Sequence, residues 1–123
     1  MSTILVVDDE IELRELLTIF LKMRGFEVLE ANSGLKALET LAENKNISLI
    51  ISDVHMQNGD GMFLLKKLKN ELKSTLPILM YSGGSSIELG VYISEGADAV
   101  FEKPINLANL LDLIRKSLNP ELA

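Results

Sequence analysis

The chain has 123 residues and a formal net charge of −6, from 18 acidic and 12 basic residues, a balance that repels nucleic acid and anionic lipid. This length suits one domain, residues 1–123, and a hydrophobic content of 47% is that of a globular protein. Cysteine, membrane-length apolar runs and a signal-peptide pattern are absent, so we expect a soluble cytoplasmic protein without disulfides or thiolate metal sites.

Short aliphatic runs alternate with amphipathic segments in the first half of the chain. Residues 3–7, TILVV, predict a buried strand, and residues 26–31, FEVLEA, predict a less apolar strand that suits a sheet edge. The helix predicted between them runs to about Arg24, with an apolar stripe of Leu13, Leu16, Leu17 and Phe20. Ser33 is a candidate cap for a second helix, whose helically spaced apolar residues are Leu35, Leu38, Leu41 and Ala42.

The second half repeats this alternation. A third strand ends at Asp53, and residues 77–82 and 98–102 predict two more, separated by a weaker helix over residues 86–95. The helix predicted from about Asp60 turns four leucines inward: Leu64, Leu65, Leu68 and Leu72. The last helix is expected to bury Leu107, Leu110, Leu111, Ile114 and Leu118. Five strands and five helices in alternation predict an α/β fold with a doubly wound parallel sheet.

Reactive side chains follow the strands at one edge of this sheet. Right-handed crossovers place all carboxyl ends together, and a ligand crevice forms where the strand order reverses. With the first strand between the second and third, that crevice lies between the first and third strands. The residues at the strand ends flanking it are Asp8, Asp9, Asp53, Ser82 and Lys103.

Each of these residues has an ordinary structural explanation when taken alone. Asp9 with Glu12 fits a helix capping pair, Asp53 a turn, Ser82 a flexible loop, and Lys103 the surface. None of these roles explains why three carboxylates, a hydroxyl and an ammonium meet at one crevice. We therefore predict a functional site there.

The chemistry of these groups points to phosphoryl transfer. Close carboxylates repel one another unless a cation joins them, and oxygen ligands without His or Cys favour Mg²⁺. A metal with a lysine and a hydroxyl forms a cradle for phosphoryl oxygens. Asp53, which stands between the acidic pair and the Ser82 and Lys103 ends, is the candidate nucleophile.

Four segments resemble the receiver domain of two-component response regulators, in particular the single-domain chemotaxis-regulator type. They are ILVVDDE, IISDVHMQNGDG, ILMYSGG and EKP, and their order and spacing agree over nearly the whole chain. The resemblance implies a flavodoxin-like strand order of 2-1-3-4-5. It also implies a phosphorylation-switched signalling domain that catalyses only its own phosphorylation and dephosphorylation.

The resemblance assigns a role to each site residue. Asp8, Asp9, Asp53 and the backbone carbonyl of His55 would bind Mg²⁺ as the cofactor. Asp53 would accept a phosphoryl group from a histidine kinase or a phosphotransfer protein.

The remaining two roles belong to the strand ends that flank the acceptor. The Ser82 hydroxyl would hydrogen-bond the phosphoryl oxygens and Lys103 would pair with them. The Lys103–Pro104 bond would be the family's cis peptide.

The chain departs from the family at two positions. Gln57 replaces the usual proline of the acceptor loop, which predicts a less rigid loop, and Val100 replaces the switch aromatic. Phe101 should point to the opposite face of its strand and cannot substitute. We therefore expect switching to spread through residues 83–93. The target would then bind the face formed by the fourth helix, fifth strand and fifth helix.

Two other functions share parts of this pattern. A flavodoxin-like cofactor-binding domain would need hydroxyls and glycines after the first strand, where this chain has DDE. A magnesium-dependent phosphatase of the haloacid-dehalogenase type would carry a second Asp two residues after Asp53, where this chain has His55. Flavin titration and turnover of a phosphate ester would test them.

Overall fold

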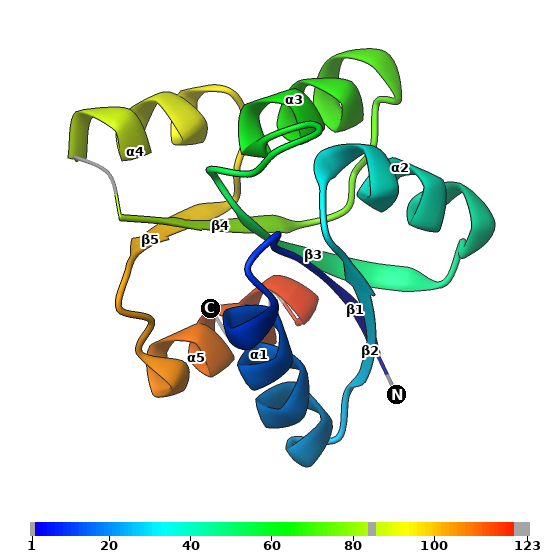
Figure 1. Ribbon diagram of the computed structural model, residues 1–123, viewed down its shortest axis with the longest axis vertical. Helices are drawn as coiled ribbons and strands as arrows, with labels where there is room; N and C mark the ends of the chain where they lie inside the picture. Colours follow the sequence, from blue (N-terminus) through cyan, green and yellow to red (C-terminus); the bar gives the residue numbers. More distant parts are fainter. Residues whose placement is uncertain (1, 84–85, 120–123) are drawn as a thin grey trace.

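The computed structural model describes residues 2–83 and 86–119, and these residues form one parallel sheet with helices on both faces (Figure 1). The strands lie in the spatial order β2-β1-β3-β4-β5. Their bounds are Thr3–Val7 (β1), Glu27–Ala31 (β2), Ile47–Asp53 (β3), Ile78–Ser82 (β4) and Ala99–Glu102 (β5). The predicted doubly wound α/β fold and its strand order are confirmed, and the less apolar β2 is an edge strand.

The helices lie on both faces of the sheet. On one face lie α1 (Ile11–Met23) and α5 (Leu107–Leu118). On the other face lie α2 (Gly34–Glu43), α3 (Gly61–Lys66) with the π-helical turn η1 (Lys67–Glu71), and α4 (Ser86–Ser94) (Figure 1). No helix in the described part of the chain is long and apolar enough to cross a membrane.

Two apolar clusters sandwich the sheet, because successive strand residues point to opposite faces. Toward α1 and α5 the strands bury Ile4, Val6, Leu49, Ile51, Leu79 and Tyr81. Toward α2, α3 and α4 they bury Leu5, Val7, Ile50, Ile78 and Met80. The central strands are therefore apolar on both faces, as expected of a parallel sheet with two helical layers.

Helix starts were predicted better than helix faces. Ser33 caps α2 by accepting a hydrogen bond from the Lys36 amide at 3.1 Å, and Asp60 caps α3 by accepting one from the Phe63 amide at 2.9 Å. In contrast, three leucines expected to face the core are more than half exposed: Leu16, Leu35 and Leu72. The helices that carry Leu16 and Leu35 bury a narrower stripe than the sequence suggests, centred on Leu17 and Leu21 in α1 and on Ala37 in α2.

The exposure of Leu72 has a local cause. The Leu72 amide donates to the Lys67 carbonyl at 2.9 Å, five residues back, and this widened turn breaks the 3.6-residue period on which the prediction relied. Leu64 and Leu65, which precede this turn, and Leu68 within it are buried as expected.

The helix α3 starts against the site-bearing strands with no space for a side chain at Gly61. A Cβ there would lie 2.8 Å from the Val54 Cα and 2.9 Å from the Asp53 carbonyl oxygen. Both neighbours are backbone atoms of the segment that carries the acceptor candidate, so they cannot rotate away.

We predict that Gly61→Ala lowers the free energy of unfolding by about 1–3 kcal/mol, because the added methyl group forces this backbone apart. Urea denaturation measures the change. Gly90→Ala is the matched control: its Cβ meets no described atom within 4 Å, and helix propensity favours Ala by up to about 1 kcal/mol. Equal stability of the Gly61→Ala variant and the wild type would contradict this reading of the close approach.

Candidate functional site

Strand register brings three carboxylates together at the carboxyl edge of the sheet. Val7 of β1 pairs with Ser52 of β3, so Asp8 and Asp53, one residue further on, are neighbours. Carboxylate oxygens of Asp8, Asp9 and Asp53 all lie within 4.8 Å of one another. Asp8 is fully buried and Asp53 is 3% exposed, whereas Asp9 is exposed. The acidic cluster predicted from the sequence is present.

Lys103 and Ser82 lie at the same edge of the sheet, on the side of Asp53 away from Asp8. The Lys103 ammonium lies 3.2 Å from Asp53 Oδ2, and its side chain is 31% exposed. Ser82 ends β4 and is fully buried, and its carbonyl accepts a hydrogen bond from the Lys103 amide at 3.0 Å. The Lys103–Pro104 peptide is cis, as the family resemblance implied.

Asp8 is held by two donors. Its Oδ2 accepts a hydrogen bond from the Tyr81 hydroxyl at 2.6 Å, and its Oδ1 accepts one from the Glu10 amide at 2.8 Å. Burial raises the pKa of Asp8, these two hydrogen bonds oppose the rise, and the negative Asp53 adds to it. Burial and the adjacent Asp8 likewise raise the pKa of Tyr81, so the hydroxyl keeps its proton.

Asp9 contacts the acceptor loop instead of capping α1. Glu10 is the N-cap of α1 and makes no side-chain capping bond, so the capping alternative for Asp9 is wrong. Asp9 Oδ2 accepts a hydrogen bond from the Gln57 amide at 3.2 Å. Proline, the usual family residue at that position, has no amide hydrogen to donate.

The acceptor loop also reaches α2 and α4. Its tip turns through Asn58 and Gly59, both with positive φ, and the Gly59 carbonyl accepts a hydrogen bond from the Gly34 amide at 2.7 Å. The His55 amide donates to Asp53 Oδ1 at 3.3 Å, and His55 Nε2 lies 2.8 Å from Glu88 Oε1 of α4.

Sequence reasoning missed three residues around this site: Tyr81, Glu88 and Arg14. The signal for Tyr81 was a polar-tipped aromatic one residue before the end of an otherwise aliphatic strand, where its hydroxyl needs a buried partner. Arg14 donates to the Asp8 carbonyl at 2.7 Å and to Glu30 at 3.0 Å. No sequence pattern links Arg14 or Glu88 to the site, since both contacts depend on helix placement.

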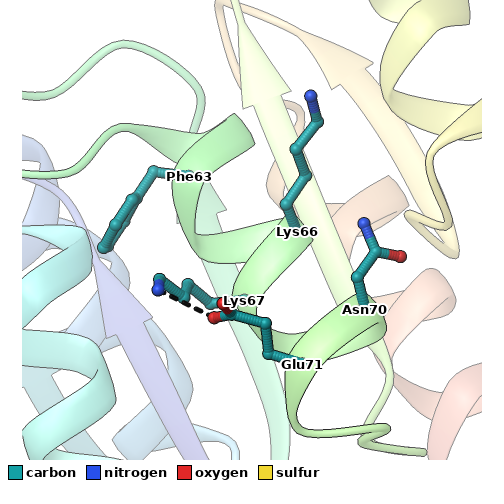
Figure 2. Close-up of a pocket in the computed structure, with 5 residues that line it drawn as sticks. All are labelled: Phe63, Lys66, Lys67, Asn70 and Glu71. Atoms are coloured by element: carbon teal, nitrogen blue, oxygen red, sulfur yellow. Dashed lines mark ion pairs between the residues drawn. The ribbon is translucent and has the colours of Figure 1, made fainter.

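A separate depression on the outer face of α3 and η1, shown in Figure 2, lies outside this cluster. It has a volume of about 300 Å³. Its Lys67 ammonium lies 2.7 Å from Glu71 and 5.7 Å from the centre of the Phe63 ring, so the charge is already paired. Its residues are Phe63, Lys66, Lys67, Asn70 and Glu71.

The donor set at the carboxyl edge fits a divalent cation. Three carboxylates supply only hard oxygen atoms, and the positive charge of Lys103, which pairs with Asp53 and also acts on Asp8, offsets part of their mutual repulsion. A small ion that keeps several water ligands suits a cluster with one exposed member, Asp9. The residues present therefore fit Mg²⁺.

The raised pKa of Asp8 predicts a pH-dependent effect of Asp8→Asn in metal-free protein. A raised pKa in the folded state gives stability that is present below the ordinary value of 3.8 and lost as pH rises through the folded value. Asn cannot ionise, so the variant should gain stability relative to the wild type as pH rises above about 4, by at most about 1.4 kcal/mol per pH unit.

Urea denaturation in EDTA across this range measures the difference. Asp112→Asn, on the exposed face of α5, controls for the loss of a carboxylate and should show no comparable trend. A stability difference between Asp8→Asn and the wild type that stays constant with pH would refute the prediction.

Comparisons with known proteins agree with this fold. The family model described as response regulator receiver domain matches residues 4–115. A transcriptional regulatory protein CpxR homolog of Haemophilus influenzae is 37% identical over 98% of this chain and 53% of its own length. The transcriptional regulatory protein ZraR of Escherichia coli is 37% identical over 94% of this chain and 26% of its own length. The chain thus spans about half or less of these relatives.

Solved structures give the same result. A receiver domain protein from Clostridium thermocellum superposes with a TM-score of 0.90 at 27% identity, over 98% of this chain and 97% of its own. A CheY-like receiver domain protein from Methanospirillum hungatei gives 0.87 at 30% identity, over 98% and 95%. These matches give no support to the phosphatase and flavodoxin-like alternatives. The chain belongs to the response regulator receiver domain family.

Proposed function

We propose that Asp53 accepts a phosphoryl group and that this modification switches partner binding. The observation that carries the proposal is the position of Asp53, with an ammonium 3.2 Å away on one side and two carboxylates within 4.8 Å on the other. An isolated carboxylate at a strand end needs neither. A carboxylate that becomes an acyl phosphate needs both a fixed cation and a metal site.

The proposed transfer uses the described side chains in distinct roles. An oxygen of Asp53 attacks the phosphorus of the donor, the bond to the donor's leaving nitrogen breaks, and an acyl phosphate forms. Lys103 balances charge on the phosphoryl oxygens, and the Ser82 hydroxyl donates to one of them. The chain would then catalyse only its own phosphorylation and its own hydrolytic return.

The proposed metal site uses Asp8, Asp9, Asp53 and the His55 backbone carbonyl. Mg²⁺ bound there would neutralise the carboxylates and the charge of the phosphoryl group. The His55 amide already donates to Asp53, which keeps this part of the loop folded against the acidic cluster.

The proposed phosphoryl donor is the phosphorylated histidine of a kinase or a phosphotransfer protein, and we place the encounter in the cytoplasm. Apolar surface on α1 supports a helical donor: the helix exposes Ile11, Leu16, Ile19 and Met23, and Ile11 lies at the helix end next to the carboxyl edge of the sheet. A cavity of about 250 Å³ continues this surface as far as Lys103 and Pro104. A donor helix lying along α1 would therefore bring its histidine next to Asp53.

The proposed target face consists of α4, β5 and α5. Val91 and Ile93 of α4 are 46% and 49% exposed, so the helix presents apolar surface to solvent as well as to the core. Val100 packs in the cluster below α4, whereas Phe101 packs in the opposite cluster, against Tyr81 at 5.7 Å between ring centres. The sequence was thus right about the direction of Phe101. Part of the predicted switch segment, residues 84–85, lies outside the described residues.

Phosphorylation of Asp53 is testable by intact mass. Acetyl phosphate with Mg²⁺ should add one phosphoryl group to the wild type and none to Asp53→Asn, because the Asn amide is a poor nucleophile. EDTA should prevent the addition. Asp60→Asn is the control and should still be labelled, because Asp60 is the N-cap of α3 and is not a member of the acidic cluster. Equal labelling of Asp53→Asn would reject Asp53 as the acceptor.

The route from the acceptor to α4 is tested by Glu88→Gln with beryllofluoride as the phosphoryl mimic. The neutral Gln side chain is a weaker acceptor than the Glu88 carboxylate. The weakened contact with His55 should leave amide shifts around Asp53 intact and reduce those in residues 86–94, because the loop pulls less on the helix. Glu95→Gln removes a like charge from the residue after α4 and should not reduce them. Val100→Ala should also preserve the response. A response in Glu88→Gln equal to the wild type would contradict this route.

A further inference from the structure

A short, buried hydrogen bond that the proposed function does not use joins Tyr81 to Asp8. Their oxygens are 2.6 Å apart, and both residues are fully buried. The Tyr81 ring cannot move the hydroxyl to solvent, because Phe101 packs beside it and the Lys103 ammonium lies 5.5 Å from its centre. In the metal-free protein, this hydroxyl is a permanent donor to a carboxylate that has no access to water.

The Tyr81 hydroxyl and a metal ion at the proposed site would both interact with the Asp8 carboxylate. A hydrogen bond to a full negative charge is stronger than one to a neutral acceptor. When a divalent cation binds Asp8, it withdraws charge from the carboxylate, so the same hydroxyl contributes less. The cation also offsets the free-energy cost of burying the Asp8 charge. When no cation is bound, the hydroxyl offsets part of this cost.

We propose that the Tyr81 hydroxyl stabilises the metal-free site at the expense of Mg²⁺ affinity, acting on Asp8 as a positioning residue. The inference rests on the proposed metal site and deepens it: Tyr81 sets how tightly the resting protein binds its cation. The thermodynamic cycle fixes the direction. Removing the hydroxyl destabilises the metal-free form more than the metal-bound form, and therefore tightens binding.

The test is Tyr81→Phe, which deletes one oxygen and keeps the ring that packs on Phe101. Mg²⁺ affinity, measured by calorimetric titration, should rise roughly fivefold, the factor expected when a hydrogen bond to a charged group weakens to one of ordinary strength. Thermal denaturation should show a lower midpoint than the wild type in EDTA and a smaller loss in saturating Mg²⁺. Tyr92→Phe, at a buried tyrosine in the opposite cluster, should change neither quantity.

A second readout uses the wild type and needs no variant to fold. The ¹³Cζ resonance of Tyr81 reports the strength of its hydroxyl's hydrogen bond and should move on Mg²⁺ addition, whereas that of Tyr92 should stay. An unmoved Tyr81 resonance, unchanged or weaker Mg²⁺ binding in Tyr81→Phe, or equal destabilisation with and without Mg²⁺ would overturn the inference. Absence of saturable Mg²⁺ binding in the wild type would instead overturn the proposed metal site, and the inference with it.

Discussion

Repulsion among Asp8, Asp9 and Asp53 is the constraint on which the rest of the site depends. Their oxygens lie within 4.8 Å of one another, a distance at which two full charges near a protein surface repel by about 3 kcal/mol. The carboxylates cannot separate, because the register of β1 and β3 fixes Asp8 beside Asp53. The fold therefore brings like charges together, and neighbouring groups must offset their repulsion.

Each carboxylate has different hydrogen-bond or ion-pair partners in the metal-free protein. Asp8 has the Tyr81 hydroxyl and the Glu10 amide, Asp53 has Lys103 and the His55 amide, and Asp9 has the Gln57 amide. Among the described residues, Lys103 is the one whose charged side chain pairs with a carboxylate of the cluster. Neutral donors hold the other oxygens without cancelling their charge, which leaves the cluster suited to the proposed cation. At Gln57 the departure from the family's proline adds a donor, which the sequence comparison alone did not suggest.

The sequence predicted the parts of the site that topology determines. Parallel strands with right-handed crossovers must place the residues after β1, β3 and β5 at one edge, so Asp8, Asp53 and Lys103 could be brought together before any coordinates. Contacts that depend on side-chain direction or on helix placement could not. Tyr81 reaches Asp8 with its ring packed at a tilt of 31° against Phe101, and His55 reaches Glu88 because α4 lies next to the loop. The Leu72 error had a similar origin, since one widened turn rotates every residue after it.

We propose that, without the family's switch aromatic, the coupling runs through the acceptor loop. Val100 is too small to rotate between a buried and an exposed position, and the aromatic residue next to it on β5, Phe101, is packed on the face of the sheet away from α4. His55 links Asp53 to α4: its amide donates to Asp53, and its imidazole lies 2.8 Å from Glu88. A change in charge at Asp53 acts first on that amide. Since α4 already exposes Val91 and Ile93, a small shift in its position changes how much apolar surface a partner can cover, and this gives the switch its readout.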